Sequence, residues 1–468
     1  MKAGVNIKMS FLQTTTAKRR EMILKGPIIP TMFLLSLPMM MMGMVQSIIP
    51  LIDGLFINNL VGVNAAGAIA YSVPVIMLMV SVAQGLGVAG MAIIGQLNGR
   101  GESKQARFIA TQIVVLAVIV GLLMVPILAI MAFAVSKYIN SQMSQDLLLY
   151  MSLSSLVIPF QFLEVIYNAI KNASGKPEAP FIRMVIMLIL KLAFNTLFIG
   201  VFSLGIIGSV SATLLANLII CIWMYYEMFI KKGEDKLTLR GFKFDFGVIK
   251  QLFKIGIPLM ISSAMMNLCF ILINNEVEKY GSATMAGQGI ANNITTICFN
   301  VPSSIGGAVT AMVSMNIGAG QGEKAKRSCI AGTVMGTVSA LIFIAIVVPS
   351  SHYLIILFTR QADVLYYANS FLNIYIYSVV GFAIFSAQIG ALNGMGRTVM
   401  PLLFNIMRVW LFRYLFILAT ERYLGVFAVF WGNLFSNLAC AVITTIIFIS
   451  LKWVSALPQS SNMTEEKP

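Results

Sequence analysis

The sequence predicts an all-α integral membrane protein in which twelve transmembrane helices form two six-helix bundles related by pseudo-twofold symmetry. Three observations predict this fold. Of the 468 residues, 58% are hydrophobic and only 10% are charged, whereas a soluble domain carries about 25% charged residues. The apolar residues form long runs, and the second half of the chain repeats features of the first half at a nearly constant offset.

The apolar runs define the expected transmembrane helices, each of which requires about 20 mostly apolar residues. Such runs lie near 29–60, 66–98, 108–136, 147–170, 181–203, 206–230, 255–278, 286–318, 328–350, 366–392, 399–420 and 424–451. Because several exceed the required length, we expect tilt, or bends at Pro38, Pro258 or Pro302. No cleavage site follows the basic N-terminal stretch, so we expect the first helix to be a retained anchor.

The runs divide the chain into an N-terminal tail (1–27), an N-lobe with spans one to six (28–230), an amphipathic linker (231–254), a C-lobe (255–452) and a C-terminal tail (453–468). The span ends on the N-terminal side hold 25 Lys and Arg residues, and the opposite ends hold four. The positive-inside rule therefore predicts that both tails and the linker are cytoplasmic. This distribution also accounts for the net charge of +15 without a nucleic-acid partner.

The two halves of the chain match at several turns. Leu37-Pro38 corresponds to Ile257-Pro258, and the stretch 99–102 corresponds to 318–321. Since six spans return the chain to the same side, the two halves must share one orientation, with an axis along the membrane normal. This repeat is typical of secondary transporters that bind their substrate between the lobes. A flippase or a channel could share it.

Short motifs in both halves extend the pattern: Pro38 and the stretches 52–57, 95–101, 171–176, 204–208, 316–320 and 392–397. In order and spacing they make the sequence resemble the multidrug and toxic compound extrusion (MATE) family from about residue 28 to 452. The resemblance implies two lobes around a V-shaped cavity in the cell (inner) membrane. It further implies export of amphipathic, mostly cationic small molecules in exchange for H⁺ or Na⁺, by a monomer surrounded by lipid and without a cofactor.

Asp53 is the first candidate for cation coupling, because an ionisable group at mid-membrane costs about 2.5–3.5 kcal/mol or more. A carboxylate shielded from water can exchange H⁺ or Na⁺ as its surroundings alternate. The alternative is a structural aspartate that caps or pairs near the outer end of its helix. In the DinF-like branch of the family, the resemblance implies, an aspartate at this position couples transport and is surrounded by polar groups that match Tyr150, Asn168 and Thr213 here.

Lys191 and Asn195 depart from that branch, which usually has asparagine and then aspartate at these positions. They share a helix face because they are four residues apart. Our hypothesis is that Lys191 is a built-in counter-cation of Asp53, which disfavours Na⁺ because a fixed ammonium competes with the ion. The alternative is that Lys191 snorkels or faces a water-filled cavity without a role in coupling.

The candidates for substrate binding are one acidic and four amide side chains: Glu164, Asn267, Asn274, Asn292 and Gln388. Glu164 lies four residues before Asn168 and could neutralise a cationic substrate, pair with Lys191 or face water. The predicted span interiors of the C-lobe contain no acid, so we expect coupling to reside in the N-lobe. Arg408 and Arg413 are expected to anchor helices or bind lipid headgroups.

Other function classes are weaker. A flippase for lipid-linked or other amphipathic precursors of the same wider superfamily is the main alternative, since such flippases have more cationic cavities and Lys191, Arg408 and Arg413 would fit one. The sequence has no nucleotide-binding P-loop and no hydrolase motif, which argues against an enzyme. Five scattered cysteines without a paired spacing and one histidine, His352, predict neither a disulfide framework nor a metal site.

Overall fold

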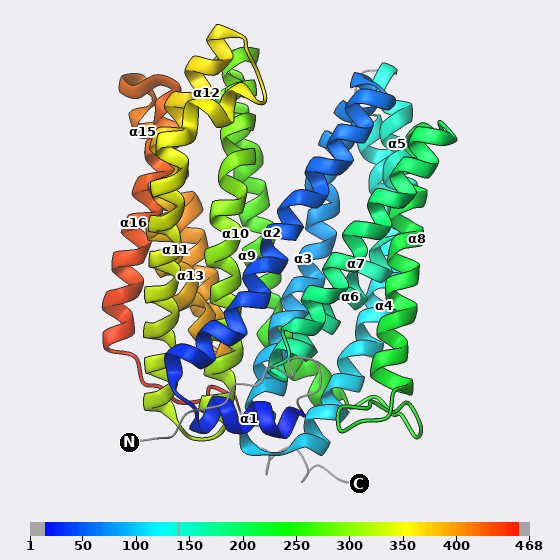
Figure 1. Cartoon of the computed structure of the whole chain (residues 1–468), viewed down its shortest axis with the longest axis vertical. Coiled ribbons are helices and arrows are strands. Elements are labelled where there is room, and N and C mark those ends of the chain that lie inside the picture. The colour runs from blue at the N-terminus through cyan, green and yellow to red at the C-terminus, as the bar shows by residue number, and fades with distance from the viewer. Residues whose placement is uncertain (1–14, 138–140, 458–468) are drawn as a thin grey trace.

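The computed structural model describes residues 15–137 and 141–457, and the regular structure in this part of the chain is helical (Figure 1). The α-helices are α1 (Thr16–Lys25), α2 (Ile28–Leu60), α3 (Val63–Arg100), α4 (Ser103–Ser136), α5 (Ser141–Ser155), α6 (Ile158–Ala173), α7 (Glu178–Asn195), α8 (Gly205–Tyr225), α9 (Phe246–Glu278), α10 (Ser282–Gly318), α11 (Gly322–Ile356), α12 (Ala362–Tyr375), α13 (Ser378–Gly394), α14 (Val399–Ile406), α15 (Leu415–Leu424) and α16 (Ala428–Ile449). Three π-helical segments, η1 (Thr196–Val201), η2 (Tyr226–Ile230) and η3 (Met407–Tyr414), and a 3₁₀ turn, η4 (Gly425–Phe427), complete the list.

These helices make twelve membrane crossings, as the hydropathy pattern predicts. The helices α2, α3, α4, α9, α10 and α11 each form one span, while α7 continues into η1 and α8 into η2. Two further spans are bent pairs: α5 with α6, at 49°, and α12 with α13, at 44°. The apolar stretch Val399–Ile449 contains the last two spans, because the chain turns back at η4 and α16 packs beside η3 and α15.

The structure shows the internal repeat most directly at its turns. Gly101 ends α3 in the left-handed region with φ of 85°, and Gly320 follows α10 with φ of 74°. Glycine adopts this conformation at little cost because it lacks a Cβ atom, so each glycine ends its helix at the same place in the repeat. Three more matching pairs of glycines have positive φ: Gly62 and Gly281, Gly175 and Gly396, and Gly205 and Gly425.

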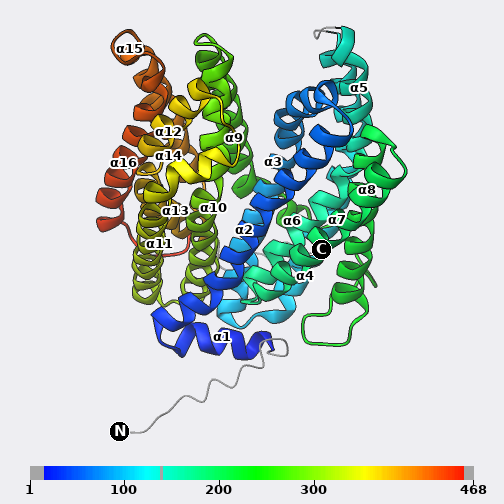
Figure 2. The ribbon, with the colours of Figure 1, turned by 45° about the horizontal axis from the view of Figure 1, so that its top comes forward.

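The N-lobe and the C-lobe meet near the end of the bundle that carries α1 and diverge toward the opposite end (Figures 1 and 2). At the closed end α3 packs on α9 and α10. The Gln96 side chain donates to the carbonyl oxygen of Gly394 at 3.0 Å, and a Cβ on Gly318 would overlap the backbone of Gln96. The absence of a side chain at Gly318 therefore permits a close approach of the two lobes, as it does at Gly99 against the backbone of Met315.

Helix α2 contacts both lobes. Its first half packs on α10 and α11 of the C-lobe, and Asn300 of α10 donates to Ser47 at 2.7 Å. Its second half packs on α7 and η1 of the N-lobe, where Ile57 belongs to a small apolar cluster with Ile199. In Figure 2 the blue ribbon of α2 accordingly runs diagonally across the molecule.

Residues 231–245 connect the lobes on the side of α1, and α9 begins at Phe246, inside the segment assigned to the linker from the sequence. Asp235 accepts a hydrogen bond from Thr16 of α1 at 2.5 Å and pairs with Lys176. Burial raises the pKa of the Asp235 carboxyl, but the Lys176 ammonium and the hydrogen bonds outweigh it, so this pKa lies below its ordinary value. The connector is thereby tied to α1 and to the N-lobe.

Candidate functional site

The structure brings Asp53, Lys191 and Asn195 together inside the N-lobe. The Lys191 ammonium forms an ion pair with Oδ2 of Asp53. The side-chain amide of Asn195 donates to Oδ1 of the same carboxylate at 2.9 Å. Lys191 and Asn195 lie one turn apart on α7, so one helix face supplies partners to both carboxylate oxygens. The side chain of Asp53 is 29% exposed and that of Lys191 only 7%.

Of the other predicted coupling residues, Tyr150 of α5 lies close enough to Asp53 to feel its charge and hydrogen-bonds to Ser154. Thr213 of α8 donates to the carbonyl oxygen of Ser209 in its own helix at 3.0 Å. Asn168 of α6 accepts a hydrogen bond from Arg183 at 3.3 Å. The three are therefore placed differently: Tyr150 beside the ion pair, and Asn168 and Thr213 in hydrogen bonds of their own.

A second ion pair lies in the N-lobe between α6 and α7. Glu164 and Arg183 are 2.8 Å apart, and the Arg183 side chain is 1% exposed. The Glu164 carboxylate also interacts electrostatically with Lys191, so the two pairs form one charged cluster. Arg183 is one of the 25 basic residues that lie at the span ends on the N-terminal side, and its contact with Glu164 was not predicted from the sequence. The polar residues at positions 164, 168 and 171 share one face of α6, and this pattern could have indicated a charged partner on a neighbouring helix.

The polar interior continues toward the end of the N-lobe that carries α1. Lys171 of α6 pairs with Glu227 of η2 at 2.6 Å, and Tyr167 donates to the same glutamate. Arg19 of α1 pairs with Glu178 at the start of α7 at 2.7 Å. The N-lobe thus holds its internal charges as opposite-sign pairs.

The predicted amides of the C-lobe are divided between internal hydrogen bonds and partly exposed positions. Gln388 is buried, donates to Thr445 at 2.7 Å and accepts from Thr444, so its amide joins α13 to α16. Asn274 accepts from Gln288 at 3.3 Å. Asn267 and Asn292 are half-buried.

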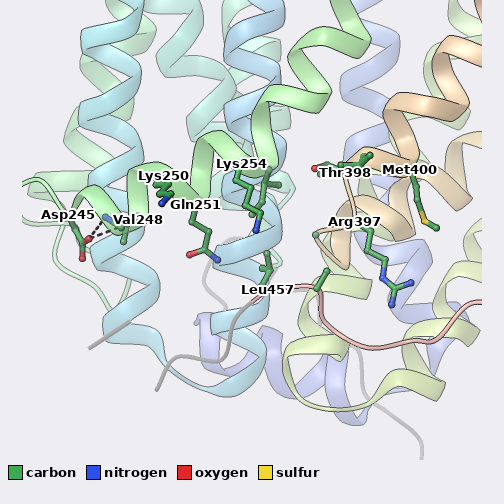
Figure 3. Close-up of a pocket in the computed structure, with 14 residues that line it drawn as sticks. Asp245, Val248, Lys250, Gln251, Lys254, Arg397, Thr398, Met400 and Leu457 are labelled. Carbon is green, nitrogen blue, oxygen red and sulfur yellow. Dashed lines mark hydrogen bonds between the residues drawn. The ribbon is translucent and has the colours of Figure 1, made fainter. Parts of the chain in front are cut away.

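A cavity of about 740 Å³ lies at the end of the C-lobe near α1, between the start of α9 and the turn from α13 to α14 (Figure 3). Lys250, Lys254 and Arg397 line it together with apolar residues such as Met400 and Leu457. None of the residues proposed from the sequence lines this cavity. In the described part of the chain no group of three or more His, Cys, Asp or Glu side chains is arranged to hold a metal ion.

Comparisons with known proteins agree with this architecture. The family model MatE matches residues 38–197 and 258–418, one segment in each lobe. The chain is 25% identical over 399 residues to "Probable multidrug resistance protein YoeA" of Bacillus subtilis, covering 81% of this chain and 84% of that one. It is 22% identical over 440 residues to "Multidrug export protein MepA" of Staphylococcus aureus, covering 92% and 95%.

Solved structures share the fold at lower identity. An outward-facing multidrug resistance MATE family transporter of the MOP superfamily superposes with a TM-score of 0.86, at 21% identity over 94% of this chain and 98% of that one. A MOP superfamily transporter from Pyrococcus furiosus gives a TM-score of 0.88, at 20% identity over the same shares. The two matched segments of the family model, the repeated six-helix lobes and the twelve crossings lead to one conclusion: the chain belongs to the MatE family, the multidrug and toxic compound extrusion transporters.

Proposed function

We propose that this protein is an antiporter that couples inward H⁺ movement to the export of amphipathic, mostly cationic compounds by alternating access. The observation that carries the proposal is the Asp53 carboxylate, which Lys191 and Asn195 hold within the membrane-spanning part of the N-lobe. The names of its relatives, a multidrug resistance protein and a multidrug export protein, support the substrate class.

The coupling step is protonation of Asp53. A neutral carboxyl no longer compensates the Lys191 ammonium, whose side chain is 7% exposed. Breaking a buried pair by removing one charge leaves the other uncompensated, which is strongly destabilising. Protonation therefore favours a second arrangement of the N-lobe in which Lys191 gains water or moves toward Glu164. Alternation between these two arrangements ties proton movement to substrate movement.

The contacts of Asp53 favour H⁺ over Na⁺. The Lys191 ammonium occupies one carboxylate oxygen and the Asn195 amide donates to the other. A sodium ion would have to displace a donor and would be repelled by the fixed positive charge beside it. A proton requires only one oxygen lone pair. An aspartate with this role supports our proposal that the chain resembles the DinF-like branch of the family.

We further propose a monomer in the cell membrane with its N-terminal side, its connector and its C-terminal side in the cytoplasm. The basic residues of the span ends support this orientation. The described chain starts with α1 and ends after α16 at the same end of the bundle as the connector (Figure 1). In this orientation the lobes diverge toward the outside.

The test uses inside-out vesicles that contain the native protein or Asp53→Asn. Accumulation of a cationic dye is measured under an imposed pH gradient and, separately, under a Na⁺ gradient. We expect the native protein to respond to the pH gradient only, and Asp53→Asn to lose this response while keeping normal expression and a monodisperse elution profile.

Asp363→Asn is the matched control, because it removes an exposed aspartate at the start of α12 and should leave transport unchanged. A pH response of Asp53→Asn equal to the native one would refute the coupling role. Lipid scrambling without a response to either gradient would instead favour a flippase.

A further inference from the structure

Six cationic side chains are buried in the described part of the chain, and their partners differ between the two lobes. In the N-lobe and α1, four of them form ion pairs with carboxylates: Arg19, Lys171, Arg183 and Lys191. The other two, Arg408 and Arg413, belong to η3 in the C-lobe and are 7% and 6% exposed. Among the ion pairs of the described residues, none involves these two arginines.

The surroundings of Arg408 are neutral. One terminal nitrogen donates to Oδ1 of Asn437 at 3.0 Å, and the other lies 3.4 Å from the sulfur of Met266. The guanidinium also lies over the rings of Phe385 and Phe382, at 5.1 and 5.5 Å from the centroids. Amide, thioether and aromatic groups stabilise a cation only in part, because none carries a negative charge.

Arg413 is held by aromatic rings, with its guanidinium 5.5 Å from the centroid of Phe270 and 6.0 Å from that of Tyr375. Within the described residues, Nε of Arg413 and Nε of Arg408 are buried without a hydrogen-bond partner. A guanidinium has five N–H donors. Each arginine therefore keeps donor capacity that the chain itself does not use.

The π-helical backbone of η3 brings the two arginines toward one another. In a π-helix the backbone hydrogen bonds join residues five apart, so such residues lie on successive turns. Arg408 and Arg413 have this spacing. Their surroundings also meet, because Tyr375 beside Arg413 and Phe382 beside Arg408 both pack against Phe299. Among the described residues, none of the five acids of positions 246–452 forms an ion pair with Arg408 or Arg413: Glu276, Glu278, Glu323, Asp363 and Glu421. The interior of the C-lobe thus carries two positive charges without a compensating carboxylate of its own.

We propose that Arg408 and Arg413 form a binding site for an oxyanion, a carboxylate or a phosphate group, attached to an apolar body. The planar guanidinium suits such groups because it offers two parallel N–H donors. A binding anion would offset the mutual repulsion of the arginines and use their free donors. The site lies in the lobe opposite to Asp53, and its occupancy requires no ion gradient.

Aromatic side chains beside the arginines suit the apolar body of the ligand. Phe299 packs against Tyr375 and Phe382 with centroids 5.3 and 5.1 Å apart, in tilted and edge-to-face arrangements. Phe270, which lies against Arg413, is 37% exposed. Rings of this kind offer both faces and edges to an aromatic or aliphatic group. The chemistry fits an amphipathic anion from water or the headgroup of an anionic phospholipid.

The test measures equilibrium binding of radiolabelled benzoate to the purified protein in nanodiscs of phosphatidylcholine, with benzylamine as the cationic counterpart. We expect saturable benzoate binding that inorganic phosphate competes away. Arg408→Gln and Arg413→Gln should each weaken benzoate binding by at least about tenfold, since each removes charge-assisted hydrogen bonds. Benzylamine binding should not change in these variants.

Arg422→Gln is the control, because it removes an exposed cation of α15 and should leave benzoate affinity unchanged. Arg408→Lys and Arg413→Lys keep the charge but lose the planar fork, and they test the site if a glutamine variant does not fold. Suppression of benzoate binding by phosphatidylglycerol in the nanodisc assigns the site to a lipid headgroup, and unchanged binding assigns it to an aqueous anion. Absence of saturable benzoate binding in phosphatidylcholine, or native affinity in both glutamine variants and both lysine variants, overturns the proposal. The Asp53 coupling test is independent, so either proposal can fail alone.

Discussion

Because Asp53 and Lys191 differ in burial, we expect substitutions of the two residues to lower the stability of the protein by different amounts. Lys191 is 7% exposed and Asp53 is 29% exposed. Asp53→Asn leaves a nearly buried ammonium without its carboxylate, whereas Lys191→Met leaves a carboxylate that can reach water or accept a proton. We therefore expect Asp53→Asn to be the more destabilising of the two substitutions.

The magnitude follows from burial. Two unit charges at contact attract by about 4 kcal/mol at the effective dielectric constant of a protein, before the cost of desolvation. Removing one partner of a fully buried pair costs about 3–5 kcal/mol, and the partial exposure of Asp53 reduces this. We expect the free energy of unfolding to fall by about 2.5 kcal/mol in Asp53→Asn and by about 1 kcal/mol in Lys191→Met, with a coupling energy of about 1.5 kcal/mol. The double variant should then be more stable than Asp53→Asn alone.

The assay is equilibrium unfolding in mixed detergent micelles, applied to the native protein, both single variants and the double variant. Asn195→Leu extends the cycle, because it removes the other donor to the Asp53 carboxylate without changing the charge. A coupling energy below about 0.5 kcal/mol, within the range of independent sites, would show that the pair contributes nothing of its own. Lys191→Met being as destabilising as Asp53→Asn would refute the argument from exposure.

Three further predictions concern other parts of the fold. Gly318→Ala should lower the free energy of unfolding by about 1–3 kcal/mol, because the added Cβ overlaps the backbone of the opposite lobe. Gly289→Ala on the same helix is the control, since its Cβ meets no atom within 4 Å and should leave the stability unchanged. Thermal unfolding of the two variants and the native protein measures the difference. The ionised Asp235 carboxylate stabilises the connector at pH values above its ordinary pKa, and this stabilisation is lost as the pH falls through its lower folded pKa. Asp235→Asn should therefore speed hydrogen exchange of α1 at pH 7, and the difference from the native protein should shrink as the pH falls through that folded pKa. Gln388→Leu should lower stability by about 1–3 kcal/mol through the loss of its two threonine contacts, without changing the affinity for a transported dye, which a binding titration would check.

Much of the architecture could be predicted from the sequence, because the membrane spans of a protein are visible as apolar segments. Uninterrupted apolar runs mark the crossings, and matching glycines and prolines mark the repeat. The juxtaposition of Lys191 and Asn195 followed from helical spacing alone. Their contact with Asp53 could be proposed because an ammonium within a span requires a partner.

Other features depended on contacts that side-chain pattern does not encode. The ion pair of Arg183 with Glu164 was missed because Arg183 lies near a span end, where a basic residue ordinarily indicates only orientation. Helix α1 is short and polar, and its contact with Glu178 through Arg19 is tertiary. The π-helical register of η3 depends on a shift in backbone hydrogen bonding, which residue types do not reveal, yet it decides how Arg408 and Arg413 lie relative to each other.

Because α2 contacts both lobes, a movement of α2 near Asp53 can change its packing on the C-lobe. Met32 contacts the C-lobe near Gly332, and Asp53 is held by α7. The two residues are 21 positions apart in the sequence, which corresponds to about 30 Å of helix. Pro38 and Pro50 lie between or near these attachment points and interrupt its backbone hydrogen bonds. A small angular change at one attachment therefore becomes a displacement of several ångströms at the other. If Asp53 is the coupling residue that we propose, its protonation would in this way change the packing of α2 on the C-lobe.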